Sequence, residues 1–113
     1  MNKFFAQNKI EKILNKVLTN NSLNVLYNMS NSCDFLVKQC LGKDKKRYIL
    51  KIMKRKSDVL RQQFINEIFI NIFLGKSFFK NFPYQVVDYN IEKGEEFFLY
   101  EMIEGRTLNG YYF

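Results

Sequence analysis

The sequence contains no His and no Trp among its 113 residues. Mechanisms that need an imidazole base, a His metal ligand or a Ser-His pair are therefore excluded for these residues. Pro occurs once and Gly five times, whereas 47% of the residues are hydrophobic and 26% are charged. This composition excludes a collagen-like or disordered chain and predicts a single folded domain, residues 1–113, with a packed core.

Cysteine is scarce as well, since Cys33 and Cys40 are the only two. They do not form a CxxC pair, and no His or further Cys could complete a zinc site, so we expect reduced thiols. Long hydrophobic runs are also missing. The first six residues are too few for a signal-peptide core, and three polar residues interrupt the most apolar stretch, residues 64–74. We therefore expect a cytoplasmic protein that does not contact a membrane.

Basic residues outnumber acidic ones by 18 to 11, which gives a formal net charge of +7. Residues 38–61 hold ten of the basic residues, whereas residues 81–113 hold two. The uneven charge favours a local anion site over a general polyanion-binding surface. Asn, Lys, Ile and Phe, whose codons are rich in A and T, make up 49 of the 113 residues, so coding bias can also account for the charge.

Hydrophobic periodicity predicts an α+β fold, with a five-stranded antiparallel sheet, one packed helix and a preceding amphipathic helix at residues 1–20. Asn20 and Asn21 are expected to end the first helix, because Asn tolerates a left-handed conformation. Ser57 and Asp58 should cap the second helix, which should run to Gly75. Alternating apolar residues place the strands, within residues 23–102, at residues 23–29, 35–41, 48–53, 84–91 and 96–102.

Lys51 is a candidate site residue because it lies within an apolar strand. A buried ammonium group is costly unless it meets a carboxylate or a phosphate. Glu67, on a largely apolar face of the second helix, is the candidate partner, so we predict salt-bridge distance between the two side chains. Protein kinases use such a strand Lys and helix Glu to position nucleotide phosphates. The alternative is a strand-edge Lys with a solvated Glu.

Three segments resemble the aminoglycoside phosphotransferase and choline/ethanolamine kinase superfamily, including its bacterial choline kinases. Residues 28–32 (NMSNS) resemble its phosphate loop, residues 48–51 (YILK) its nucleotide-lysine strand, and residues 98–108 (FLYEMIEGRTL) its fifth strand and hinge. The loop departs from the family pattern because it has no Gly.

The resemblance implies an ATP-binding N-terminal lobe of protein-kinase-like fold, with residues 101–108 as its hinge. Lys51 and Glu67 would serve the phosphates, as would the loop residues, whose turn could form an anion-binding concavity. The carbonyl of Glu101 and the N–H of Ile103 would meet the adenine edge. An apolar slot for the base would be lined by Val25, Val37, Ile49 and Met102. The residues expected to bind the nucleotide are thus Ser30, Asn31, Ser32, Lys51, Glu67, Glu101, Met102 and Ile103. The alternatives are an ordinary hairpin loop and plain core.

In this family a second lobe supplies the His-x-Asp catalytic loop, its downstream Asn and an Asp that binds Mg²⁺. None of these follows the hinge before the sequence ends at residue 113, so we expect an N-terminal lobe without catalytic residues, in which Mg²⁺ would require the missing lobe. Choline or a similar alcohol would be the acceptor. An exposed apolar strip between the lobes would favour self-association, and its expected members are Met102, Ile103, Leu108 and residues 111–113.

Two other functions remain open. A small basic module could use residues 38–61 to bind nucleic acid or an acidic protein, although no RNA-binding aromatic signature accompanies the charge, so nucleic acid is the less favoured partner. A regulatory pseudokinase lobe would instead dock on a partner through the face that a second lobe normally covers.

Overall fold

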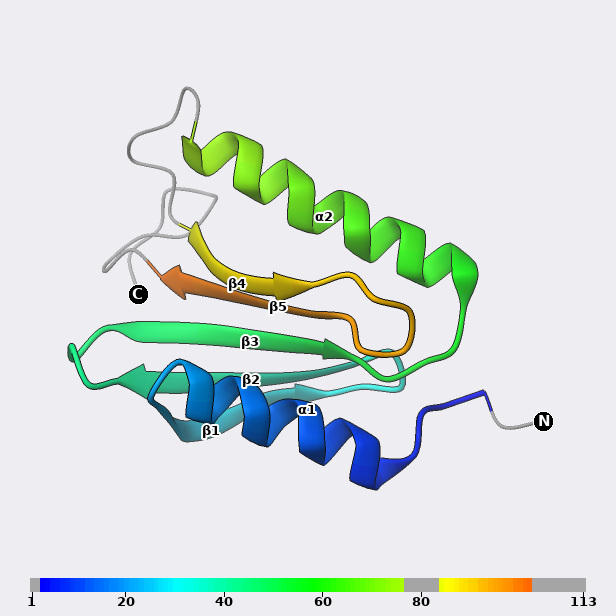
Figure 1. Ribbon diagram of the computed structural model, residues 1–113, viewed down its shortest axis with the longest axis horizontal. Helices are drawn as coiled ribbons and strands as arrows, with labels where there is room; N and C mark the ends of the chain where they lie inside the picture. Colours follow the sequence, from blue (N-terminus) through cyan, green and yellow to red (C-terminus); the bar gives the residue numbers. More distant parts are fainter. Residues whose placement is uncertain (1–2, 77–83, 103–113) are drawn as a thin grey trace.

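A computed structural model describes residues 3–76 and 84–102 of the chain (Figure 1). The five strands form one antiparallel sheet in the order β1-β2-β3-β5-β4. The α+β fold expected from the sequence is confirmed. In chain order the elements are α1 (Gln7–Asn20), β1 (Leu23–Asn31), β2 (Phe35–Gly42), β3 (Arg47–Met53), α2 (Asp58–Lys76), β4 (Tyr84–Asn90) and β5 (Phe97–Met102).

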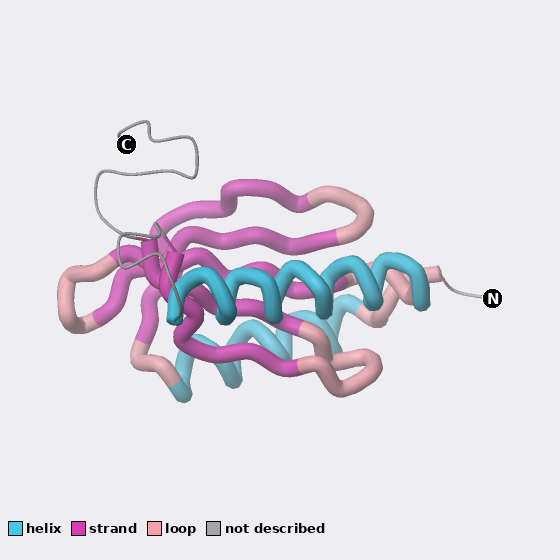
Figure 2. Tube along the Cα trace, turned by 90° about the horizontal axis from the view of Figure 1, so that it is seen from above, coloured by secondary structure: helices cyan, strands magenta, loops and turns pink. Residues whose placement is uncertain are grey.

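The two helices pack on opposite faces of this sheet, as the alternation of side chains along β3 shows. Leu50 and Ile52 lie in a core cluster with α1, whereas Met53 lies in a second cluster with Phe64 and Ile68 of α2. Successive strand residues point to opposite faces, so Lys51 shares the α2 face with Met53. Both helices run roughly along the strands (Figures 1 and 2).

The ends of the helices agree in part with the sequence. The Ser57 hydroxyl accepts a hydrogen bond from the Leu60 N–H at 3.2 Å, so the predicted cap of α2 is confirmed. The expectation for the end of α1 was wrong in one respect. Asn21 has a φ of −110°, and the left-handed residue is Ser22, with a φ of 54°. Asn21 ends the helix through its side chain, whose amide donates to the Val17 carbonyl at 3.0 Å.

The first strand is longer than predicted. β1 continues through residues 30 and 31, which pair with Val37 and Leu36 of β2. Two register shifts, between Val25 and Tyr27 and between residues 28 and 30, let the strand remain paired beyond the simple alternation. The gap expected between the first two strands, residues 30–34, is therefore reduced to residues 32–34.

The turn between β2 and β3 requires glycine at residue 42. A Cβ there would lie 2.5 Å from Asp44 Oδ1 and 2.8 Å from Tyr48 Cε2. The Tyr48 hydroxyl donates a 2.6 Å hydrogen bond to Asp44 Oδ2. This hydrogen bond lowers the pKa of the Asp44 carboxyl, while burial followed by the same bond raises the pKa of Tyr48 to about 12. The pair thus closes the turn with an ionised acceptor and a neutral donor.

The two cysteines should differ sharply in reactivity. Cys33 is exposed, whereas Cys40 is fully buried, and this burial raises the pKa of its thiol to about 11. Because the thiolate is the reactive species, a thiol reagent at mildly alkaline pH should label Cys33 quickly and Cys40 only after denaturation. Mass spectrometry of the labelled peptides provides the measurement. A native Cys33→Ser variant should have no fast thiol, and rapid labelling of Cys40 in it would contradict the packing described above.

Candidate functional site

The ammonium group of Lys51 and the carboxylate of Glu67 form an ion pair across the space between β3 and α2. Lys51 Nζ lies 3.1 Å from Glu67 Oε1 and 3.3 Å from Oε2. The contact predicted from the sequence is confirmed. The Lys51 side chain is 23% exposed and that of Glu67 is 42% exposed, so solvent reaches the pair from one side. The pair is therefore not sealed in the core, and Glu67 is its more exposed member.

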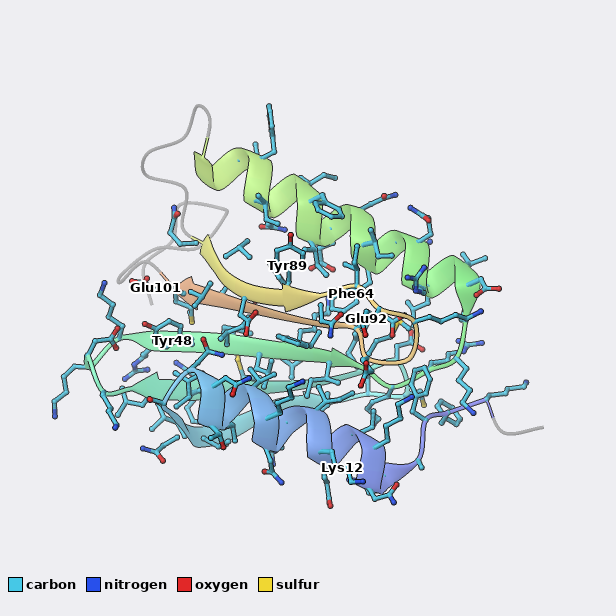
Figure 3. The ribbon with its side chains drawn as sticks, viewed as in Figure 1. Lys12, Tyr48, Phe64, Tyr89, Glu92 and Glu101 are labelled. Carbon is cyan, nitrogen blue, oxygen red and sulfur yellow. The ribbon has the colours of Figure 1, made fainter. Side chains whose placement is uncertain are left out.

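Helical spacing on α2 places Glu67 beside the sheet. Phe64 and Ile68, on either side of Glu67, are buried against the sheet, and Figure 3 shows Phe64 on the sheet-facing side of α2. Asn71, one turn further, donates its side-chain amide to the Glu67 carbonyl at 2.7 Å. Glu67 thus sits at the border between the buried and exposed faces of the helix, where its carboxylate can reach Lys51.

Two aromatic rings complete the surroundings of the Lys51 ammonium. The Phe35 ring centre lies 4.2 Å from Lys51 Nζ and the Phe64 ring centre 5.6 Å from it. The rings pack against each other edge to face, with centres 5.0 Å apart. Sequence reasoning missed Phe35 as a site residue. Its position two residues before Val37, the β2 partner of Lys51, could have indicated the shared face.

The segment expected to form a phosphate loop differs from the prediction. Ser30 and Asn31 belong to the paired part of β1, so they are not loop residues. Ser32 does lie in the remaining loop, where its hydroxyl accepts a hydrogen bond from the Phe35 N–H at 3.1 Å and donates to the Phe35 carbonyl at 3.3 Å. Lys54 restrains the loop, because its ammonium group donates a hydrogen bond to the Ser32 carbonyl at 2.7 Å.

The pairing register of the first three strands gives the distance between the Ser30 and Lys51 backbones. Ser30, Val37 and Lys51 lie in one row across β1, β2 and β3. Neighbouring strands are about 4.8 Å apart, so the Ser30 backbone is about 10 Å from that of Lys51. A phosphate chain could span this distance, whereas a single phosphate group could not contact both backbones.

The predicted hinge begins at the other end of the sheet. Glu101 has strand partners on both sides, Tyr48 on β3 and Gln85 on β4, and its carboxylate forms an ion pair with Lys46 at 3.3 Å. Figure 3 shows Tyr48 and Glu101 together at this end. Met102 pairs with Tyr84 of β4, one position beyond the last pair between β3 and β5. The ladder on the β3 side thus ends where the hinge was expected. Ile103 and the rest of the hinge and apolar strip lie outside the described residues.

Three of the four residues proposed for an apolar slot share the face of Lys51. Val37 pairs with Lys51, Ile49 is two residues before it on β3, and Met102 is two residues after Tyr100, which packs against the α2-side cluster. The assignment of Val25 was wrong. Val25 pairs with Cys40, which belongs to the core cluster under α1, so Val25 lies on the opposite face.

A buried ion pair fixes the start of α2 against the sheet. The Glu96 side chain is fully buried, and its Oε2 lies 2.7 Å from Arg61 Nε. The two atoms attract as charges without hydrogen-bond geometry. Glu96 Oε1 accepts a 2.8 Å hydrogen bond from the Gly94 N–H, and Arg61 donates to the Ile91 carbonyl at 2.5 Å.

Beside this pair, a cavity of about 280 Å³ is lined by Phe5, Met53, Lys56, Ser57, Asp58, Arg61, Lys93 and Glu96. It contains neither Lys51 nor Glu67.

No family model, curated protein or solved structure matches the chain. Among residues 3–76 and 84–102, no three His, Cys, Asp or Glu side chains gather in a way that could hold a metal ion. Over the same residues, no helix has the length and hydrophobicity needed to span a bilayer. The assignment of function therefore depends on the site itself.

The buried pair should contribute much more to stability than an exposed one. Arg61→Met leaves the buried Glu96 carboxylate without its cation, so we expect the free energy of unfolding to fall by about 3–5 kcal/mol. Lys93→Met is the matched control, because Lys93 pairs with Asp58 at 3.6 Å with both side chains largely exposed. That variant should change stability by less than about 0.5 kcal/mol. Urea denaturation measures both, and equal effects would contradict the role assigned to Glu96.

Proposed function

We propose that this chain is the ATP-binding lobe of a small-molecule phosphotransferase of the choline or ethanolamine kinase type, acting in the cytoplasm. The ion pair between Lys51 and Glu67 carries the proposal. Lys51 lies on a central strand, and the carboxylate of Glu67 on α2 holds its ammonium group in place. Such a lysine presents a fixed positive charge to a phosphate. The pair is partly exposed to solvent, mainly at the Glu67 carboxylate, so it lies near the surface of the sheet.

The spacing along β3 supports a nucleotide as the ligand. Tyr48, the partner of Glu101, precedes Lys51 by three residues, or about 10 Å of strand. A nucleotide with its base near Met102 and its phosphates near Lys51 would extend along this distance. Ile49 lies on the same face between the two ends, and Val37 lies on that face level with Lys51. An apolar surface of this kind suits a base.

We assign the chemical step to a second lobe of the kind found in the resembled family. The proposed reaction transfers the γ-phosphate of ATP to the hydroxyl of choline or a similar alcohol. In the resembled family the catalytic base and the Mg²⁺ ligands come from a second lobe, and residues 1–113 contain no His for a His-x-Asp loop. The role of this chain's residues is to bind and orient the phosphates. A pseudokinase lobe would share that binding without turnover.

The alternative of a basic binding module is favoured by one observation. The turn between β2 and β3 exposes Lys43, Lys45, Lys46 and Arg47 at one end of the sheet. Lys46, however, is paired with Glu101, and the turn carries Asp44 as well. The charge on this turn is therefore partly neutralised, and we favour the nucleotide-binding lobe.

Binding measurements separate the two functions. We expect ATP to bind weakly, with a dissociation constant of about 1 mM, and Lys51→Ala to weaken it by about tenfold or more, because a charged hydrogen bond is lost. Lys12→Ala, on the exposed face of α1, is the control and should leave ATP binding unchanged. Phosphorus NMR of the nucleotide provides the measurement.

A short DNA duplex should be titrated at two salt concentrations in parallel. A basic module would bind the duplex far better than ATP and would lose affinity steeply as salt rises. If that pattern appears and Lys51→Ala alters neither ligand, the phosphotransferase assignment is wrong.

A further inference from the structure

Phe35 contacts both Lys51, which the proposed function assigns to phosphate, and Ser32, which the family resemblance assigns to the phosphate loop. Its ring is centred 4.2 Å from the Nζ atom of Lys51. Its backbone N–H donates to the Ser32 hydroxyl at 3.1 Å, and its carbonyl accepts from the same hydroxyl at 3.3 Å. One residue therefore engages the candidate phosphate lysine through its side chain and the candidate phosphate loop through its main chain.

The ring of Phe35 limits access to the Lys51 ammonium. The ammonium has three N–H donors, and the two Glu67 oxygens lie within 3.3 Å of it on one side. The face of an aromatic ring carries negative charge density, which attracts a cation and repels an anion. A phosphate oxygen therefore cannot approach Lys51 from the direction that the Phe35 ring occupies.

The Ser32 hydroxyl is also occupied by Phe35, through hydrogen bonds to its backbone. It has one donor hydrogen, which is directed to the Phe35 carbonyl. To donate to a phosphate, it must release that carbonyl, and the first residue of β2 then loses a restraint. Binding of phosphate by the loop and movement of Phe35 are thus coupled by one hydrogen bond.

The position of Phe35 allows the ring to move. It is the first residue of β2, it is half-buried, and it follows residues 32–34, which lie outside the strands. On the α2 side its ring packs edge to face on Phe64. Phe64 itself is 1% exposed and belongs to the core, so of the two rings beside Lys51 only that of Phe35 can swing away without opening the core.

We propose that Phe35 is a gate over the phosphate site, closed in this structure. A nucleotide phosphate must displace the ring from Lys51, and displacement is accompanied by release of the Ser32 hydroxyl. This inference rests on the proposed function. It adds that affinity for phosphate is set by the contact between Phe35 and Lys51, whereas affinity for a nucleoside without phosphate is not.

The first test replaces the ring by a side chain that packs but has no aromatic face. Phe35→Leu should bind ATP about 3- to 10-fold more tightly than the wild type, since a cation–π contact no longer opposes phosphate binding. Binding of adenosine should be unchanged. Phe5→Leu is the matched control, because the Phe5 ring also lies near lysines, at 5.0 Å from Lys9 Nζ and 5.7 Å from Lys56 Nζ. That control should bind ATP as the wild type does.

A second measurement reports on the gate without ATP. Acylation of lysines, followed by mass spectrometry, should show Lys51 reacting several-fold faster in Phe35→Leu, with Lys12 unchanged. In a third variant, Phe35→Trp, the new indole is the only one in the chain, so its fluorescence should report greater solvent exposure when ATP is added.

The outcomes distinguish the gate from the proposed function. If ATP binding depends on Lys51 but Phe35→Leu neither tightens it nor exposes Lys51, the gate is wrong and the proposed function stands. If neither the wild type nor Phe35→Leu binds ATP, the proposed function fails and the gate fails with it. Tighter ATP binding together with faster Lys51 labelling supports both.

Discussion

The buried carboxylate of Glu96 is the constraint on which the placement of α2 depends. A fully buried charge is tolerated only when it is paired and hydrogen-bonded. Here Gly94, with a φ of 90°, supplies an N–H from the turn before β5, and Arg61 supplies the cation from α2. Glu67 lies six residues beyond Arg61, or about 9 Å along the helix. The same contacts that satisfy Glu96 therefore bring Glu67 within reach of β3.

A structural role alone does not account for Lys51. Its ion pair is partly exposed to solvent, and such pairs add little to stability. Ile49 and Met53, its neighbours on the same face of β3, are buried apolar residues, and an apolar side chain at position 51 would pack against Phe64 at no desolvation cost. A lysine at the centre of an otherwise apolar face is better explained by a ligand that needs its charge.

The sequence predicted the order and type of every element, because most have a recognisable apolar pattern or a helix cap and most end at a polar turn. It also predicted the contact between Lys51 and Glu67, since the two residues are the opposite charges on adjoining apolar faces. It did not predict that Ser30 and Asn31 are paired in β1, because register shifts break the period of two on which strand prediction depends. Val25 was assigned to the wrong face because its cross-strand partner, Cys40, faces α1, which the sequence of the first strand does not show. The role of Phe35 was missed because it depends on a contact between β2 and β3, and the register of two strands cannot be read from either strand alone.

The absence of Gly from the loop before β2 connects these findings. A glycine-rich loop can turn its backbone N–H groups toward a phosphate, since Gly has access to left-handed conformations. Here the Phe35 N–H is instead directed to the Ser32 hydroxyl, and the Ser32 carbonyl is held by Lys54. The closed loop must therefore rearrange before it can bind phosphate, and apparent affinity falls in proportion to the population of the open form. Any contact that stabilises the open position of Phe35 would raise nucleotide affinity without touching the nucleotide.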